Sequence, residues 1–314
     1  MLILPECGLI RSVKVHRSNA HAFVDWVEAS TLFLGEASYT PQLLDMLIEN
    51  EIYEEQDFAW EFIDQCTSII EKRMARMGMG YPICIENDKI AAKSDWTDFP
   101  AYSFCLFSSL SILYPKWKSE LLGGDYTTQG EIFEKLSQES IKIIFPGWVV
   151  NNTGWSKTNT VNIISIVGHI AEWLNEQIGE TRRWTKETAK EAGLDLVSYR
   201  PFSDANPGVP VYLWQCASGN NWKTKRKTPD LDLWTRIISW TVNPSKGMTI
   251  PFALPDDEMV QEGAIVAGLL LDRHRLLEPG RNNADWISAA LRDEIVDWLN
   301  PYIAQTPRFE DNVL

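Results

Sequence analysis

The sequence lacks the cysteine patterns that build disulfide frameworks and zinc sites. Only five cysteines occur in 314 residues, and no two of them have CxxC spacing. An odd, dispersed set argues against a zinc site and against a disulfide-stabilised fold, and it favours a reduced, cytoplasmic setting. The cysteines are Cys7, Cys66, Cys84, Cys105 and Cys216.

Long hydrophobic runs are also missing. The first residues show no basic segment before an apolar core, so they do not resemble a signal peptide. The most apolar stretch, residues 99–115, contains four serines and is short for a bilayer span. We therefore expect a buried helix there and no membrane partner. The sequence has no Walker loop, dinucleotide glycine fingerprint or GxSxG elbow, which leaves ATP-driven, oxidoreductase and serine-hydrolase functions without support.

Positive charge is scarce, because the net charge is −14, whereas DNA binding usually needs a basic surface. The deficit is uneven: residues 117–250 contain 15 Lys and Arg against 14 Asp and Glu, a net +1 that leaves −15 for the remainder. This central part includes the basic run Lys223–Lys227. The acidity weakens a nucleic-acid function without excluding it. A protein that mimics DNA is less favoured, because the negative charge avoids the centre.

Apolar residues are plentiful, at 45% of the chain with 14 tryptophans, and can build a real core. Their steps of three and four residues predict helices over 21–35, 41–51, 54–78 and 99–114. Glycines and threonines at 123–128 then interrupt the pattern. We therefore expect an α-helical N-terminal domain, residues 1–118, with a regulatory or partner-binding role, and a second domain, residues 119–314.

The second domain mixes helices and strands, which predicts an α/β fold with a small central sheet. Helices are expected over 129–145, 161–178, 230–241 and 284–303, and strands over 194–200, 209–217 and 248–254.

Two polar residues stand out in apolar strands of this domain. Asp195 has only apolar neighbours, and a buried carboxylate needs a cation or hydrogen-bond donors to offset its desolvation. Gln215 poses the same question near the end of the next strand. A hairpin folded near residue 205 pairs positions that sum to about 410, which sets Asp195 opposite Gln215. Their oxygens suit a hard divalent cation. Alternatively, Asp195 accepts hydrogen bonds from a helix N-terminus or pairs with Arg200.

An Asp in one strand, followed after a hairpin by Glu or Gln and a lysine, resembles the PD-(D/E)XK nucleases, and the Gln form resembles their Mrr-type, QxK-like branch. Phe133-Glu134 is similar to that branch's FE helix. GLDLVSYRPF, WQCASGNNWKTK and Tyr81-Pro82 also resemble an uncharacterised bacterial family associated with antiviral defence. The resemblance covers residues 130–250, and the N-terminal third only loosely. It implies a restriction-endonuclease-like fold, a mixed central sheet flanked by helices.

The resemblance also implies a site. Mg²⁺ or Mn²⁺ would be held by Asp195 as principal ligand, by Gln215, by the backbone carbonyl of Cys216, and by Glu134 as an outer or second-metal ligand. The motif lysine is missing, because position 217 is Ala. Lys225, or else Lys223, could swing back from the next element, with Ala217 leaving room. The expected DNA contacts are Asn220, Asn221, Trp222, Arg226, Lys227, Arg182 and Arg183.

These expectations describe a metal-dependent endonuclease that cleaves double-stranded DNA, the effector of a bacterial anti-phage system, acting with a partner protein or as a homo-oligomer. The alternative, which Ala217 favours, is a catalytically inactive nuclease-fold subunit that binds DNA or protein within a defence complex.

Overall fold

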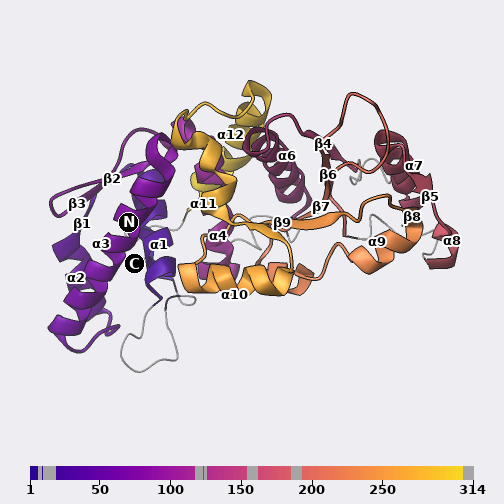
Figure 1. Cartoon of the computed structure of the whole chain (residues 1–314). Coiled ribbons are helices and arrows are strands. Elements are labelled where there is room, and N and C mark those ends of the chain that lie inside the picture. The colour runs from indigo at the N-terminus through magenta and orange to yellow at the C-terminus, as the bar shows by residue number, and fades with distance from the viewer. Residues whose placement is uncertain are drawn as a thin grey trace. The chain divides into compact units, whose positions relative to one another are not determined.

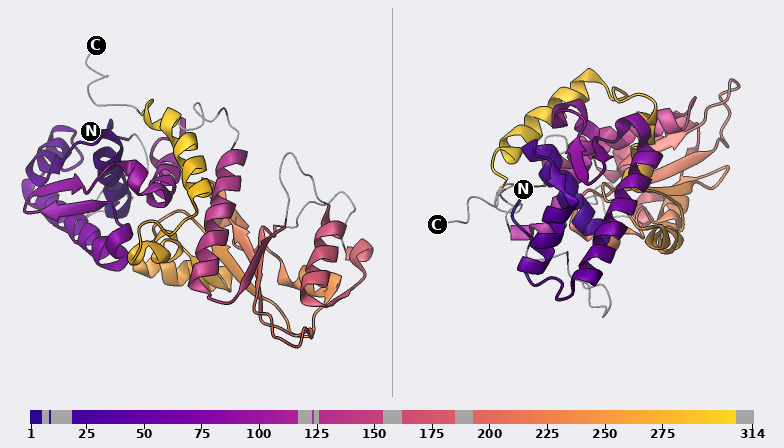
Figure 2. Two further views of the ribbon diagram at one scale, coloured as in Figure 1. Left: turned by 90° about the horizontal axis from the view of Figure 1, so that it is seen from above. Right: turned by 90° about the vertical axis from the view of Figure 1, so that its left-hand side faces the viewer.

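The computed structural model describes residues 1–5, 9, 19–116, 123, 126–153, 162–184 and 193–306, drawn in Figures 1 and 2. The chain divides into two compact units: Met1–Asp125 with Leu277–Leu314, and Tyr126–Leu276. This division differs from the limits expected from the sequence. The C-terminal segment, which we expected in the second domain, groups with the N-terminal helices.

The first unit is mainly helical, at the positions that the periodicity predicted, but it also contains a small sheet. Its helices are α1 (Ala20–Leu34), α2 (Thr40–Glu49), α3 (Gln56–Met77), α4 (Pro100–Leu113) and α12 (Ala289–Ile303). The strands β1 (Ser38–Tyr39), β2 (Ile83–Glu86) and β3 (Lys89–Ala92) form an antiparallel sheet of order β1-β3-β2. Strands of two to four residues are too short for alternation to reveal them.

Helix α4 is buried on nearly all sides, which explains its apolar sequence. The predicted buried helix is confirmed. In the part of the chain that the structure describes, no helix has the length and apolar character that spanning a bilayer requires. Phe104 and Phe107 pack on Trp298 of α12, with ring centroids 5.4 and 5.6 Å apart. These ring contacts explain why α12 groups with the first unit.

A buried ionic cluster lies in the first unit. Arg73 donates to Asp25 at 2.7 Å and to Glu28 at 2.8 Å. The hydroxyls of Tyr81 and Tyr102 also donate to Glu28, whose side chain is fully buried. Burial, followed by the charge of Glu28, raises the pKa of Tyr81 well above its usual value, so the phenol stays a donor. Tyr81 of the Tyr81-Pro82 segment is therefore part of the interior.

The second unit is an α/β domain. Its main strands are β4 (Val149–Asn152), β6 (Leu196–Tyr199), β7 (Val211–Cys216), β9 (Ser245–Thr249) and β10 (Leu269–Leu271). Its main helices are α6 (Thr127–Ile144), α7 (Ile163–Leu174), α9 (Leu231–Ile237) and α10 (Asp256–Val266). The short elements are α8 (Thr181–Trp184), α11 (Arg273–Leu276), a 3-10 turn at Asn220–Lys225, and the pair β5 (Gln177–Ile178) and β8 (Ile238–Ser239).

The five main strands form one mixed sheet of order β10-β9-β7-β6-β4. Strands β4, β6 and β7 pair antiparallel, whereas β7, β9 and β10 pair parallel. Figure 1 shows α6 on one side of the sheet and α9 and α10 on the other. The expected mixed sheet flanked by helices is confirmed. Several predicted elements differ in extent. The helix expected over 230–241 ends at Ile237, the helix expected over 161–178 ends at Leu174, with Gln177–Ile178 in β5, and the helix expected over 284–303 begins at Ala289. The strand expected over 248–254 lies at Ser245–Thr249.

The register of the β6–β7 hairpin is the predicted one. Leu196 pairs with Trp214 and Val197 with Leu213, so paired numbers sum to 410. Val197 and Leu213 belong to the apolar core formed with α7 and α9. Trp214 turns to the opposite face, where its indole N–H donates to Ser198 at 2.8 Å. The position of the turn between the two strands predicted this register, since both strands are apolar on both faces.

Candidate metal site at one end of the mixed sheet

Asp195 and Gln215 lie together at the end of the β6–β7 hairpin. Gln215 Nε2 donates to Asp195 Oδ2, and the backbone N–H of Cys216 donates to the same oxygen at 2.5 Å. The backbone N–H of Asp195 donates to the carbonyl of Trp214 at 2.9 Å, which continues the hairpin ladder to this pair. Asp195 is 8% exposed and Gln215 is 4% exposed. The predicted convergence of the two side chains is therefore confirmed, but Gln215 turns its amide nitrogen, and not the expected oxygen, toward the carboxylate.

The backbone around Asp195 is held from the neighbouring strand β4 as well. Thr153, which follows β4, donates from its N–H to the carbonyl of Asp195 at 3.0 Å and from its hydroxyl to that of Leu194 at 3.1 Å. Asp195 is thus anchored on both sides just before β6 begins, so the carboxylate has a fixed origin. Such anchoring is what a site needs to hold a ligand atom in place.

Glu134 of α6 is directed to the same end of the sheet. Asn152, the last residue of β4, donates from Nδ2 to Glu134 Oε2 at 3.0 Å. Burial raises the pKa of the Cys216 thiol well above its usual value, and the charges of Asp195 and Glu134 raise it further. Asn152 pairs with Leu196, so its hydrogen bond places the glutamate of the predicted FE helix near the start of β6.

The far side of Gln215 meets the segment that follows β7. The hydroxyl of Thr228 lies 2.9 Å from Gln215 Oε1 and 2.7 Å from the carbonyl of Lys225. The backbone of Lys225 is thus only two hydrogen bonds away from Gln215, and its side chain is half-buried. The sequence did not identify Thr228. Its only signal was its position, a threonine between a basic run and a proline.

The second candidate lysine is engaged elsewhere. Lys223 Nζ lies 2.6 Å from Glu258 and 3.4 Å from Glu262, both on α10. These carboxylates raise the pKa of Lys223, with the hydrogen bond to Glu258 as the largest cause. Arg226 also pairs with Glu262, at 2.8 Å. The guanidinium of Arg226, which was predicted to contact DNA, is thus already paired with a carboxylate of α10.

The surroundings of Ala217 correct two expectations. Ala217 is fully buried in an apolar cluster with Trp222 and Met248, so the space beside its methyl group is filled. Trp222 is 4% exposed and stacks on Phe252, with centroids 6.5 Å apart. Its ring is a core element and does not face solvent, where DNA would lie. An apolar cluster therefore occupies the position at which the motif lysine would stand.

The remaining predicted DNA contacts are exposed on two segments. Asn220, Asn221 and Lys227 lie on or after the 3-10 turn that follows β7, and Arg182 and Arg183 lie on α8. Arg183 forms an ion pair with Glu180 at 3.1 Å.

Next to these arginines, the exposed ring of Trp184 carries the guanidinium of Arg236 at 4.3 Å from its centroid. The sequence alone does not reveal this pair, because its two members lie on different helices.

The donor set at the sheet end favours a hard cation. It comprises the carboxylates of Asp195 and Glu134, the amide of Gln215 and the backbone carbonyl of Cys216, which lies 3.4 Å from Gln215 Nε2. Oxygen ligands of this kind suit Mg²⁺ or Mn²⁺. Among the described residues, no cluster of three or more His, Cys, Asp and Glu side chains is arranged to hold a metal. A cation here would therefore depend on the neutral oxygens as well.

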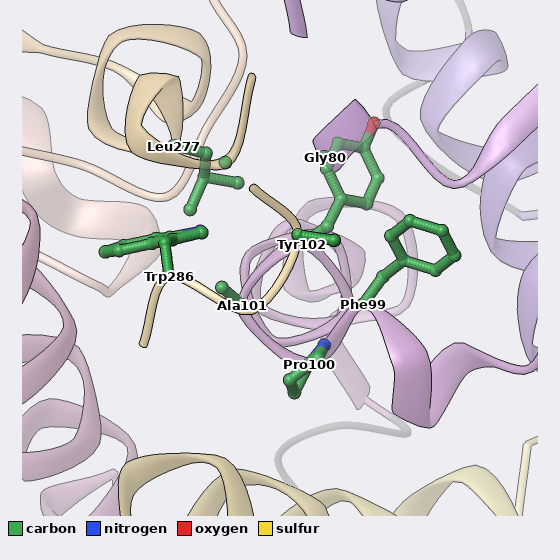
Figure 3. Close-up of a pocket in the computed structure, with 9 residues that line it drawn as sticks. Gly80, Phe99, Pro100, Ala101, Tyr102, Leu277 and Trp286 are labelled. Carbon is green, nitrogen blue, oxygen red and sulfur yellow. The ribbon is translucent and has the colours of Figure 1, made fainter. Parts of the chain in front are cut away.

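A separate hollow lies within the first unit, shown in Figure 3. It is lined mainly by apolar and aromatic groups, among them Phe99, Pro100, Leu277 and Trp286. The hydroxyl of Tyr102, which also lines it, is bonded to Glu28. The lining therefore offers packing surface and little chemistry.

Comparisons of the chain with protein-family models, with curated proteins and with solved structures find no match.

Proposed function

We propose that the second unit is a metal-dependent nuclease of the restriction-endonuclease-like superfamily, which hydrolyses phosphodiester bonds in double-stranded DNA with Mg²⁺ or Mn²⁺. One observation carries the proposal: Asp195 and Gln215 meet at the end of a mixed sheet, with Glu134 directed there from a flanking helix. The resemblance to PD-(D/E)XK nucleases supports the proposal, because it assigns these three residues to a metal site.

Each residue has a physical task in this reaction. A bound divalent cation would polarise the phosphodiester and lower the pKa of a coordinated water. Asp195 and the carbonyl of Cys216 would supply oxygens from fixed backbone positions, and Gln215 would add its amide oxygen once that oxygen turned away from Thr228. Because an apolar cluster fills the place of the motif lysine, Lys225 would orient the attacking water from the turn after β7 and offset the charge that develops on the phosphate. The water would lose a proton to solvent as its oxygen bonds to phosphorus, the bond to the leaving sugar oxygen would break, and that oxygen would take up a proton from solvent.

The biological role that we propose, from the resemblance, is a cytoplasmic effector in bacterial antiviral defence. The first unit would sense the trigger or bind a partner protein or a second copy of the chain. Between Glu36 and Glu71 it has ten Asp and Glu residues, all exposed, and no Lys or Arg. Such a surface repels the DNA backbone, so this unit is suited to a protein partner.

The decisive experiment incubates the full-length protein with plasmid DNA and Mg²⁺ or Mn²⁺. Wild type should nick or linearise the plasmid, and Asp195→Ala and Lys225→Ala should not. Lys142→Ala, a change of an exposed lysine in the last turn of α6, is the matched control and should retain cleavage. If both site variants cleave as fast as wild type, the proposed site is refuted.

A second candidate is a nuclease fold without catalysis that binds DNA or protein within a defence complex. The apolar cluster around Ala217 favours it, because the motif lysine has no counterpart there. A wild type that is silent with both metals but binds DNA in a mobility-shift assay would support this alternative.

A further inference from the structure

We infer that Thr228 sets the orientation of the Gln215 side-chain amide, and that a cation bound at Asp195 is accommodated when this amide turns over. The inference rests on the proposed metal site. It adds a positioning residue and a means by which cation binding is transmitted to Lys225.

The hydroxyl of Thr228 has one hydrogen for two hydrogen-bond acceptors. Its hydroxyl lies 2.7 Å from the carbonyl oxygen of Lys225 and 2.9 Å from Gln215 Oε1. Both partners are acceptors, but a threonine hydroxyl carries one hydrogen. One of the two contacts therefore lacks a hydrogen in the orientation that also sets Gln215 Nε2 on Asp195.

Turning the amide by half a revolution resolves this shortage. Gln215 Nε2 would then donate to Thr228 Oγ1, and the hydroxyl hydrogen would go wholly to the carbonyl of Lys225. The same turn points Gln215 Oε1 at Asp195 Oδ2. Two acceptor oxygens in contact repel each other unless a cation lies between them. The turned amide is thus favoured with a cation bound, and the amide on Asp195 is favoured without one.

The local packing holds Thr228 in place for this exchange. Gly193 has φ +71°, and a Cβ on it would lie 2.7 Å from Thr228 Cβ and 3.2 Å from Gln215 Oε1. Glycine is therefore required for Thr228 and Gln215 to approach each other here. The methyl side of Thr228 rests on Gly193, which leaves its hydroxyl for Gln215 and Lys225.

The consequence is a link between cation binding and the lysine. When the Thr228 hydroxyl no longer shares its hydrogen between two acceptors, it donates that hydrogen only to the backbone carbonyl of Lys225. The backbone N–H of Thr228 already donates to this carbonyl at 2.9 Å, so the turn that carries Lys225 gains a second complete hydrogen bond when the cation is bound. Thr228 acts through Gln215 and Lys225, without touching the substrate.

The experiment measures the Mn²⁺ dissociation constant of the full-length protein by calorimetry and by electron paramagnetic resonance. Thr228→Val removes the hydroxyl at nearly the same volume and should weaken Mn²⁺ binding by about 10-fold or more, as losses of outer-shell hydrogen bonds do. Thr228→Ser should restore it. Thr224→Val is the matched control, because the Thr224 hydroxyl donates only to the backbone of Asn221 in the same turn, and it should bind as wild type.

A second readout does not depend on the stability of the valine variant. In wild type, the amide nitrogen signal of the Gln215 side chain should shift on addition of Mg²⁺, and it should stay in place in Asp195→Ala. Unchanged Mn²⁺ affinity in Thr228→Val, with binding abolished in Asp195→Ala, would overturn the role of Thr228 and leave the metal site standing. Absence of Mn²⁺ binding by wild type would overturn both.

Discussion

Each unit buries carboxylates, and the hydrogen-bond donors that stabilise these carboxylates differ between the two units. Glu28 of the first unit accepts from the guanidinium of Arg73, which carries no acceptor, and from two phenols. Asp195 of the second unit accepts from a side-chain amide and a backbone N–H, and the amide presents a donor or an acceptor depending on its orientation. The first cluster is built to stay closed. The second can receive a ligand without a change in the fold.

The largest effect is expected from breaking the first cluster. Arg73→Met removes the cation from between Asp25 and Glu28, and a buried charge that loses its partner costs about 3–5 kcal/mol. The free energy of unfolding, measured by urea denaturation, should fall by this amount. The control is Arg183→Met. Arg183 and its partner Glu180 are both exposed, and such surface ion pairs contribute about 0–1 kcal/mol to the free energy of unfolding. Equal losses in the two variants would contradict a closed structural cluster.

A change at Asp195 in the second unit should lower the activity of the protein more than its stability. Asp195→Asn keeps the shape of the side chain but removes the charge that would hold a cation. Plasmid cleavage should fall by about 100- to 1,000-fold, the range for loss of one group that stabilises the transition state. The melting temperature should stay close to that of wild type, because an amide can still accept from the Cys216 N–H. A large drop in melting temperature with cleavage retained would show that Asp195 is structural, like Glu28.

Lys225 and Lys223 of the second unit should differ in their effect on the cleavage rate. Lys225→Ala should lower the cleavage rate by about 100-fold, as general acid–base and water-orienting groups do. Lys223→Ala should leave the rate close to that of wild type, because the ammonium of Lys223 is paired with Glu258 and Glu262. Single-turnover rates at saturating Mn²⁺ separate the two. If Lys223→Ala cleaves slowly and Lys225→Ala cleaves as fast as wild type, Lys223 and not Lys225 is the lysine that acts in cleavage.

The helices of the first unit and the β6–β7 register were predictable, since both follow from local rules. Apolar periodicity marks a helix, and the position of the turn residues sets the register of a hairpin. The pairing of Asp195 with Gln215 followed from the same arithmetic. Glu134 entered only through a resemblance, since nothing local links α6 to the hairpin.

The rest depended on tertiary contacts between distant segments. Ala217 faces Trp222 and Met248 rather than an incoming lysine, and Lys223 is captured by α10, which lies far along the chain. Likewise, the grouping of α12 with the first unit follows from Trp298 packing on α4. For this reason we do not expect a fragment that starts at residue 119 to be a fair test of the nuclease unit, because it would leave α12 without its partner.

The smallest effect concerns the exposed arginines of α8, where the second unit would touch the DNA backbone. Arg182→Ala should weaken DNA binding alike for all sequences and reduce the slope of log affinity against log salt by about 1, because one phosphate contact is lost. The basic surface is small, so each contact represents a large share of the electrostatic attraction. Fluorescence anisotropy with a labelled duplex at several salt concentrations measures the slope. Lys89→Ala, a surface charge of the first unit, is the control. If it changes the slope as much as Arg182→Ala does, DNA binding is not confined to the second unit.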